Sequence, residues 1–328
     1  MIKLGTIGTS WITEEFIRSA KLNQDIKITA VYSRDKQKAI DLIKKTELSS
    51  ARSFSDFSEM LSQIDAIYIA SPNGLHYSQA KFFLSQQKHV FLEKSMTFKL
   101  EEIIELRKIA EFNDVILMEA YKVIHLPQYK FLSNMVNHSL PFLANFQMNQ
   151  YSSKMPLVKQ GIYPPVFDPN LGKGSTYDIL VYPVELAIAL FGKVIEVKSL
   201  AQKLPNGVDL TNIVLLKHEN GILTNISCSK AAYGRYFSEI YSDKQTLSFK
   251  NCTQLNEIEL YELEKDDVKT LFKCKKDEQD AFAYETQMFI DLILNQNTKM
   301  KNFLLDISQE TIRVLNLIEI NQEKIGEY

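Results

Sequence analysis

The sequence predicts an α/β protein, with a doubly wound parallel sheet at the N-terminus followed by an α+β domain with a mostly antiparallel open sheet. Three observations carry this prediction. Short apolar segments alternate with amphipathic helical segments over residues 1–122, as parallel βαβ crossovers require. Beyond residue 122, one strand-like segment follows another without intervening helices, which favours antiparallel pairing. The 328 residues exceed what one hydrophobic core usually serves, so we expect two domains, residues 1–122 and 123–328.

In the first predicted domain, apolar segments of strand length recur along the chain. They are Ile2–Ile7, Ile26–Tyr32, Ala66–Ala70, His89–Leu92 and Val115–Met118. The segments between them carry apolar residues at helical spacing, as in Ile12, Phe16 and Ala20, so that one face of each helix is buried. Strands joined in this way form a sheet that helices cover on both faces.

Proline residues punctuate the chain after Tyr121, around one helical segment near residues 128–136, and mark the start of the second predicted domain. The strands expected there are Phe142–Ser152, Val194–Gln202, Thr211–His218, Leu223–Ser229, Arg235–Ser242, Thr246–Phe249 and Ile258–Leu263. Helical patterns return at Ala281–Leu294 and Ser308–Glu319, which completes an α+β domain.

The composition is that of a globular protein and excludes several classes of partner. Hydrophobic residues make up 45% of the chain and charged residues 24%. The 38 basic and 40 acidic residues leave a net charge of -2, so the broad positive field that nucleic acid or an anionic membrane requires is not expected. No apolar run approaches the roughly 18 residues of a spanning helix, and the first residues do not form a signal-peptide pattern. We therefore expect a cytoplasmic protein without a membrane or nucleic-acid partner.

Cysteine and histidine usage gives no sign of disulfides or metal. The chain has 3 cysteines, an odd number without CxxC spacing, which we interpret as reduced and buried or incidental. No group of His, Cys, Asp and Glu has the spacing of metal ligands, so we expect no bound metal.

The loop between the first predicted strand and the first predicted helix is a candidate phosphate site. Its residues are Gly8, Thr9, Ser10, Trp11 and Ile12. In this position backbone N–H groups and the positive end of a helix can hold a pyrophosphate. Of the dinucleotide fingerprint G-x-G-x-x-G/A only the first glycine is present, because Ser10 and Thr13 occupy the other two positions. The motif alone fits a plain tight turn equally well, whereas its strand-to-helix context favours a nucleotide.

The end of the second predicted strand bears on which dinucleotide binds. NAD-binding folds usually place an acidic residue there for the ribose hydroxyls, but this chain has Ser33, Arg34 and Asp35. Ser33 and Arg34 suit a 2′-phosphate, and a charge-assisted contact of about 1.5–3 kcal/mol gives roughly 10- to 100-fold preference for NADP over NAD. Two alternatives stay open. Arg34 can be a solvated loop residue with Asp35 as a helix N-cap, or Asp35 can hold the ribose of NAD.

Further polar segments fall where strands of the predicted sheet end, which is where ligands of open α/β sheets bind. They are Ser71-Pro72-Asn73-x-x-His76, Glu93-Lys94-Ser95 and Glu119-Ala120-Tyr121, followed downstream by Gly172-x-Gly174-x-x-x-Asp178-x-x-x-Tyr182. With these segments at this spacing, the chain resembles the Gfo/Idh/MocA oxidoreductases over nearly its whole length. The family is named after glucose-fructose oxidoreductase, inositol dehydrogenase and MocA, and the resemblance is nearest to its dihydrodiol dehydrogenase-like branch.

The resemblance implies a fold, an activity and an assembly. The fold is a Rossmann domain followed by an α+β domain whose open sheet makes subunit contacts in a homodimer or higher homo-oligomer. The activity is NAD(P)-dependent oxidation of CH–OH groups or the reverse reduction, with a sugar, polyol or related alcohol or carbonyl compound as the small-molecule substrate. A reaction centre formed around Lys94 and Tyr182 is expected.

The resemblance also implies a role for each matched residue. Lys94 corresponds to the lysine beside the nicotinamide and the reacting oxygen, Tyr182 to the acid/base, and Asp178 to the aspartate one helical turn earlier. The residues matched to the cofactor site are Ser71, Pro72, Asn73, His76 and Glu93, the last of which packs against the nicotinamide.

The chemistry requires such a set, because a hydride that leaves or reaches carbon must be matched by a proton on the attached oxygen. A tyrosine with a pKa near ~10 is a poor base at neutral pH unless a cation such as Lys94 stabilises its phenolate. Each residue also has an ordinary structural interpretation. Lys94 can be a surface ion pair with Glu93, Tyr182 beside Pro183 can be a core residue, and His76 can be a packed or capping histidine.

Departures from the family pattern motivate a competing class. Ser10 replaces a glycine, Ser95 replaces the proline that follows the lysine, and Ile124 stands where many members have an arginine before a histidine. These changes fit a non-catalytic dinucleotide-binding regulator, whereas retention of Lys94 and Tyr182 favours an enzyme. A purely structural interaction protein is a third class, and it predicts no affinity for any cofactor.

Overall fold

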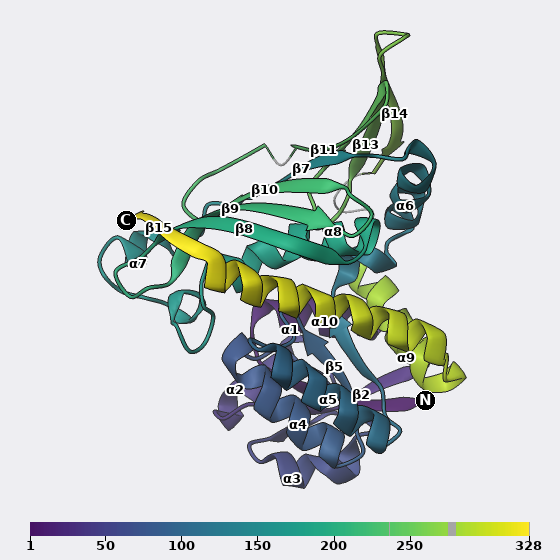
Figure 1. The fold of residues 1–328 in the computed structure, drawn as a ribbon. Coiled ribbons are helices and arrows are strands. Elements are labelled where there is room, and N and C mark those ends of the chain that lie inside the picture. The colour runs from purple at the N-terminus through teal and green to yellow at the C-terminus, as the bar shows by residue number, and fades with distance from the viewer. Residues whose placement is uncertain (236, 275–279, 328) are drawn as a thin grey trace. The chain divides into compact units, whose positions relative to one another are not determined.

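A computed structural model describes residues 1–235, 237–274 and 280–327 (Figure 1). By their contacts the residues form two compact units, and each is discontinuous in sequence. The first comprises Met1–Lys122 and Asp280–Asp306, and the second comprises Val123–Gln279 and Ile307–Tyr328. The division differs from the one expected from the sequence in the segment 280–306, which joins the first unit.

The first unit is built on a parallel sheet in the order β3-β2-β1-β4-β5-β6. The strands are β1 (Ile2–Ile7), β2 (Ile26–Tyr32), β3 (Arg52–Phe54), β4 (Ala66–Ile69), β5 (His89–Glu93) and β6 (Leu117–Ala120). The chain proceeds outward from β1 in one direction and from β4 in the other, so the strand order reverses between these two central strands. The predicted doubly wound sheet is confirmed, and its switch point lies between β1 and β4.

Helices connect these strands and cover the sheet. They are α1 (Trp11–Ala20), α2 (Lys36–Lys45), α3 (Phe57–Met60), α4 (His76–Ser85), α5 (Leu100–Phe112), α9 (Ala281–Asn295) and the first turns of α10 (Thr298–Asn321). Helices α4 and α5 lie side by side, as Figure 1 shows, and α1 packs with α9. Glu102 supports the start of α5, because its Oε2 accepts the N–H of Lys99 at 3.3 Å.

Helix α9 belongs to the first unit because its apolar face packs against that unit's sheet. Phe289 stacks on Phe91 of β5 with ring centroids 4.9 Å apart, and Phe16 of α1 stacks on Tyr68 of β4 at 3.7 Å. Tyr68 and Phe91 contact each other as well, with centroids 5.5 Å apart. An aromatic layer therefore joins α1 and α9 to one face of the sheet.

The second unit is built on a sheet in the order β14-β13-β12-β11-β7-β10-β9-β8-β15 (Figure 1). Its strands are β7 (Leu143–Asn149), β8 (Val194–Lys203), β9 (Asp209–His218), β10 (Leu223–Ser229), β11 (Phe237–Ser242), β12 (Gln245–Lys250), β13 (Glu257–Glu262), β14 (Asp267–Lys273) and β15 (Gln322–Glu327). Pairing is antiparallel except between β7 and β10 and between β8 and β15. The predicted mostly antiparallel sheet is confirmed. Position 236 of the predicted strand Arg235–Ser242 lies outside the described residues.

Helices of the second unit leave one sheet face open among the described residues. The helices are α6 (Pro127–Ser139), α7 (Met155–Val158), α8 (Val181–Phe191) and the later turns of α10. Helix α8 is almost entirely buried and contacts β7 and β10. Along β9, Val214 and Leu216 are buried, whereas the alternate residues Ile213 and Leu215 are 42% and 52% exposed. The alternation identifies an outer face that carries apolar side chains.

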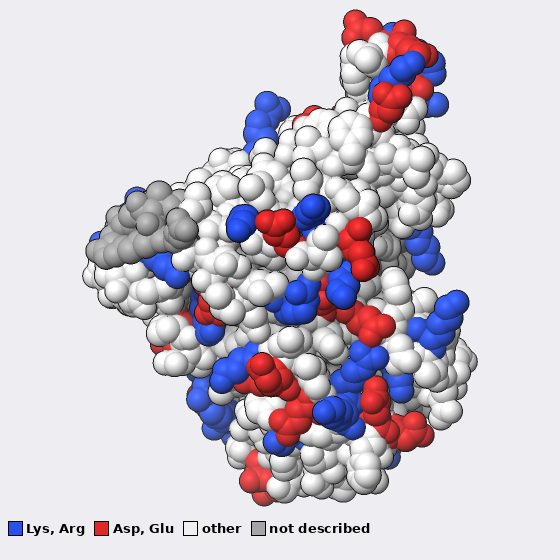
Figure 2. All heavy atoms as spheres, in the orientation of Figure 1, with Lys and Arg blue, Asp and Glu red and all other residues white. Residues whose placement is uncertain are grey.

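The surface carries charges of both signs. On the face that Figure 2 presents, acidic and basic side chains are interspersed, and both signs gather at the hairpin between β13 and β14. The ion pairs Lys265–Glu262 at 2.6 Å and Lys244–Glu264 at 2.7 Å lie near that hairpin. None of the helices in the described part of the chain is long and apolar enough to span a membrane.

Candidate functional site

The loop after β1 requires glycine at position 8. Gly8 has φ +109°, and a Cβ there would lie 2.6 Å from the carbonyl oxygen of Ala70, which follows β4. Its N–H donates to the carbonyl of Tyr32 at the end of β2 (3.4 Å). The backbone of this loop therefore lies directly over the ends of its two neighbouring strands, at the switch point of the sheet.

The rest of the loop leads into α1. Ser10 is the N-cap residue in extended conformation, and its carbonyl accepts the N–H of Glu14 at 3.1 Å. Trp11 is 72% exposed, whereas Thr9 and Ile12 are half-buried. The first N–H groups of a helix have no partners within that helix, so this end of α1 is suited to bind an anion.

At the end of β2 the three candidate selectors have different surroundings. The N–H of Ser33 donates to the carbonyl of Phe54 at 3.1 Å, and Arg34 is exposed. Asp35 is the N-cap of α2, and its Oδ1 accepts the N–H of Gln37 at 3.1 Å. The N-cap interpretation of Asp35 is therefore confirmed. Arg34 is exposed at this strand end, as the interpretation of a solvated loop residue also expects.

His76 joins the loops that follow β4 and β5. The side chain is fully buried, and its Nδ1 and Nε2 each lie 2.9 Å from a carbonyl oxygen, those of Ser95 and Ser71 respectively. Burial lowers the pKa of His76 to about 4, so the ring is neutral at pH 7 and donates from one nitrogen only. Pro72 is exposed beside it, and Asn73 begins the short helical turn before α4. In this conformation His76 is a packed residue that shapes the two loops.

Glu93 and Lys94 lie at the end of β5. Glu93 Oε1 accepts the hydroxyl of Tyr68 at 2.5 Å, and its Oε2 accepts the N–H of Lys94 at 3.3 Å. Burial raises the pKa of Glu93 against the opposing effect of Lys94 and Lys122. The peptide bond between Lys94 and Ser95 is cis. Lys94 therefore follows a carboxyl group that is held on the aromatic layer of the sheet.

The third strand end is tied to the second. Glu119 and Tyr121 are buried, and Glu119 Oε1 accepts the N–H of Met96 at 2.8 Å. Together with the contacts of His76, this bond connects the segments that follow β4 and β5 with the end of β6. The structure thus brings together the three strand-end segments identified in the sequence.

In the second unit, Asp178 and Tyr182 occupy successive turns of one helical stretch. Residues Thr176–Leu180 form a π-helical turn that runs directly into α8, where Tyr182 is the second residue and is half-buried. Asp178 lies one helical turn before Tyr182, as expected, and the helical stretch begins with this wider turn. Such turns are rare and recur at functional sites.

Lys230 is a partner of Asp178 that the sequence did not reveal. Its Nζ forms an ion pair with Asp178 Oδ2, and only 7% of its side chain is exposed. The same Nζ lies 5.7 Å from the ring centroid of Phe167. Lys230 directly follows β10, where a polar residue is ordinary. Nothing in the sequence indicates that this lysine is buried or paired.

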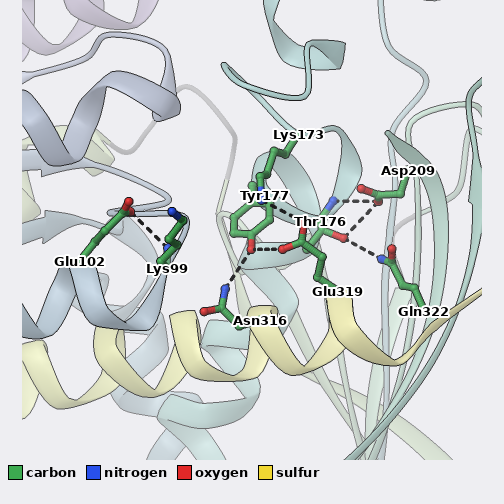
Figure 3. A network of polar contacts seen from close by, with 9 residues as sticks. All are labelled: Lys99, Glu102, Lys173, Thr176, Tyr177, Asp209, Asn316, Glu319 and Gln322. Atoms are coloured by element: carbon green, nitrogen blue, oxygen red, sulfur yellow. Dashed lines mark hydrogen bonds and ion pairs between the residues drawn. The ribbon is translucent and has the colours of Figure 1, made fainter. Parts of the chain in front are cut away.

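A polar network holds the segment before Asp178 (Figure 3). The N–H and hydroxyl of Thr176 donate to Asp209 Oδ2 at 3.0 and 3.1 Å, and Gln322 Nε2 donates to Thr176 Oγ1 at 3.2 Å. Burial raises the pKa of Asp209 to about 6. The adjoining Tyr177 hydroxyl donates to Glu319 Oε2 at 2.9 Å, and Lys173 pairs with Glu319 at 2.9 Å. Thr176 and Tyr177, the two residues before Asp178, are thus both held by hydrogen bonds. These bonds fix the backbone from which the Asp178 side chain extends.

The fold and the strand-end segments define a class, the dinucleotide-dependent oxidoreductases. Residues 2–121 match the family described as "Oxidoreductase family, NAD-binding Rossmann fold", and residues 144–248 match the GFO/IDH/MocA C-terminal domain. The chain belongs to the Gfo/Idh/MocA family of oxidoreductases, as its motifs predicted, and is an enzyme that acts on CH–OH groups or the corresponding carbonyls.

Two curated relatives share much of its length. The scyllo-inositol 2-dehydrogenase (NADP(+)) IolU of Bacillus subtilis is 33% identical over 319 residues, which are 96% of this chain and 95% of IolU. The uncharacterized oxidoreductase YgjR of Escherichia coli is 32% identical over 265 residues, 79% of each chain.

Solved structures share the fold at lower identity. KijD10, a 3-ketoreductase from Actinomadura kijaniata in complex with NADP and TDP-benzene, matches with a TM-score of 0.86 and 18% identity. The match covers 100% of this chain and 99% of KijD10. At this identity the likeness concerns the fold alone.

Proposed function

We propose that the protein is an NADP-preferring oxidoreductase that transfers hydride between the nicotinamide and a sugar, a polyol or a related alcohol or carbonyl compound. The observation that carries this proposal is the similarity to IolU along 96% of the chain, since that relative is named as an NADP(+)-dependent inositol dehydrogenase. The residue types at the strand ends fit the same chemistry.

The backbone of the first unit fits a dinucleotide. At Gly8 any side chain would meet the Ala70 carbonyl, so the loop presents bare backbone at the switch point, with the start of α1 beside it. Arg34 and Ser33 would hold the 2′-phosphate, because Asp35 uses its carboxylate to cap α2.

The reaction needs a proton carrier and a cation besides the hydride, which the bound dinucleotide accepts or supplies. We assign the proton to the hydroxyl of Tyr182 and assign Lys94 to stabilise the phenolate or the developing alkoxide. Asp178 lies four residues before Tyr182 and is held by Lys230, so its carboxylate is positioned to orient the polar end of the substrate. Binding and orienting the substrate is thus the role that we give the second unit.

The outer face of the second sheet is our proposed subunit interface. Ile213, Leu215 and Leu223 on β9 and β10 are 42%, 52% and 49% exposed. Apolar side chains grouped on an open sheet mark surfaces that associate. We therefore propose a homodimer or higher homo-oligomer formed through this face.

The experiment that tests the function uses the sole tryptophan of the chain, Trp11, which lies in the proposed phosphate loop. NADPH and then NADH are titrated while Trp11 emission and energy transfer to the reduced nicotinamide are followed, and Arg34→Ala is titrated alongside. Tight binding of NADPH that weakens about 10- to 100-fold in Arg34→Ala supports the proposal. Turnover is then screened with inositols, aldoses and their keto forms. Binding without any turnover would favour a regulator, and no binding of either cofactor would refute the proposal.

A further inference from the structure

The packing of α9 against β5 brings Glu285 of α9 to the end of the strand where Glu93 lies. Phe289 stacks on Phe91 at 4.9 Å with an interplanar angle of 14°. Glu93 lies two residues beyond Phe91 and so on the same face of the strand, while Glu285 lies one helical turn before Phe289. Lys122 begins the short 3₁₀ turn that follows β6, and its Nζ lies 5.6 Å from the centroid of the Phe282 ring. The first turns of α9 therefore lie at the carboxyl ends of the strands, where Glu93 is.

Both carboxyl groups are withdrawn from water. Glu285 is 1% exposed, and its Oε2 is buried without a hydrogen-bond partner in the described part of the chain. Glu93 is held by the hydroxyl of Tyr68 at 2.5 Å. Burial raises the pKa of each group, and the negative charge of Glu93 raises that of Glu285 further. Ionising both carboxyls therefore costs more than ionising one of them, because the charge on one disfavours the charge on the other.

The remaining charged groups around the pair are few. The cation Lys122 lowers the pKa of Glu285 and the negative charge of Asp280, the N-cap residue of α9, raises it, while Lys94 and Lys122 lower the pKa of Glu93. From α1, the neutral ring of Phe16 faces the same layer. Glu119 pairs in register with Leu92, so it lies on the opposite face of the sheet. Protonation of the pair consequently makes the local charge more positive by one unit, beside the cations Lys94 and Lys122.

We propose that Glu285 and Glu93 form a proton-sharing carboxyl pair that sets the preference of the enzyme between oxidised and reduced dinucleotide. The inference rests on the proposed function, which puts the nicotinamide at the strand ends beside the switch point. The oxidised ring carries one positive charge and the reduced ring carries none. The pair that shares one proton carries a net negative charge and therefore favours the oxidised cofactor, and the fully protonated, neutral pair removes that advantage. Glu285 is the specificity-determining residue, since it supplies the second carboxyl.

The test compares dissociation constants of NADP+ and NADPH between pH 5.5 and 8.5 for the wild-type enzyme, Glu285→Gln and Glu101→Gln. Glu101 is an exposed helical glutamate of the same unit and serves as the matched control. The 2′-phosphate titrates in both cofactors, so its effect cancels in the ratio of the two constants. As pH rises, we expect the wild type and Glu101→Gln to shift toward NADP+ by about tenfold, and Glu285→Gln to shift less than about twofold. An equal shift in Glu285→Gln would overturn the inference.

A measurement without cofactor separates failure of the pair from failure of the proposed function. A glutamate whose folded pKa is raised stabilises the fold at low pH, and that stability is lost as pH rises through the folded pKa. The melting temperature of the wild type should therefore fall relative to Glu285→Gln as pH increases from 5 to 8. Parallel curves would refute the shared proton whatever the cofactor does. Divergent curves in an enzyme that binds neither cofactor would support the raised pKa of Glu285 and refute both its link to the cofactor and the proposed function.

Discussion

Replacing Gly8 by alanine tests the claim that this loop holds the dinucleotide by its bare backbone. Gly8 has φ +109°, and an added Cβ would come within 2.6 Å of the Ala70 carbonyl oxygen. An L residue in such a conformation costs about 1–3 kcal/mol in stability. The clash adds a displacement of the loop, because the opposing atom belongs to the backbone and cannot rotate away.

The consequence for binding follows from the hydrogen bonds that the displaced backbone loses. A hydrogen bond from an N–H to an ionised group contributes about 1.5–3 kcal/mol, and each 1.4 kcal/mol corresponds to about tenfold in affinity. We therefore expect Gly8→Ala to weaken NADPH binding by about 10- to 100-fold, measured by titration of Trp11 emission, and to lower the melting temperature.

Gly221→Ala is the matched control. Gly221 lies in the turn between β9 and β10 with φ +91°, and nothing lies within 4 Å of a Cβ built there. This variant has a comparable conformational cost without the clash, so it should lose stability and keep its affinity for NADPH. Unchanged NADPH affinity in folded Gly8→Ala would refute the assignment of the loop.

Three further outcomes are expected. Tyr182→Phe should lose about 10²–10⁴ in kcat while binding NADPH normally, and normal turnover would show that another group carries the proton. Leu215→Lys should convert the oligomer to monomers, as measured by sedimentation at micromolar concentration. The control Phe112→Lys changes an exposed apolar position of the first unit and should leave the oligomer intact. Monomeric wild-type protein would contradict the proposed interface. The pKa of His76 is lowered to about 4, so the unfolded state binds the proton first and the stability of the fold falls as pH drops from about 6.5 to 4. In denaturant titrations His76→Gln should remove up to about 3 kcal/mol of that loss. The same loss of stability in wild type and variant would contradict the buried, neutral state of His76.

Elements with a strong apolar period were predictable, and weakly patterned ones were not. Strand β10 has the bounds Leu223–Ser229 that were predicted from its alternating pattern. A strand buried on one face has apolar residues at every second position, and this pattern is visible in the sequence. Strand β3 is three residues at a sheet edge and β14 is mostly exposed, so neither carries a buried pattern. The sequence therefore did not predict these two strands.

The order of segments along the chain does not predict which unit residues 280–306 join. Residues 280–306 follow the second sheet in sequence, yet Phe289 stacks on Phe91 of the first. An amphipathic helix shows which of its faces is apolar but not which sheet receives that face. That choice depends on shape complementarity between distant residues, which a single sequence does not display.

The candidate site divides in the same way. Residue types at strand ends pointed to the positions of Gly8, Glu93 and Lys94, because parallel strands align their carboxyl ends at one edge. Their partners were not foreseeable. Lys230 pairs with Asp178 across 52 residues of sequence, and Glu285 reads as an ordinary helical glutamate until α9 is placed on the sheet.

The discontinuous first unit constrains how the protein is made. The ribosome releases residues 1–122 long before 280–306, and at 5–20 residues per second the interval is roughly 10–40 s. Throughout that time the aromatic layer of Phe16, Tyr68 and Phe91 lacks the helix that covers it. The nascent sheet is therefore an exposed apolar surface that chaperones can bind, and a fragment that ends at residue 122 should aggregate instead of folding into an isolated nucleotide-binding domain.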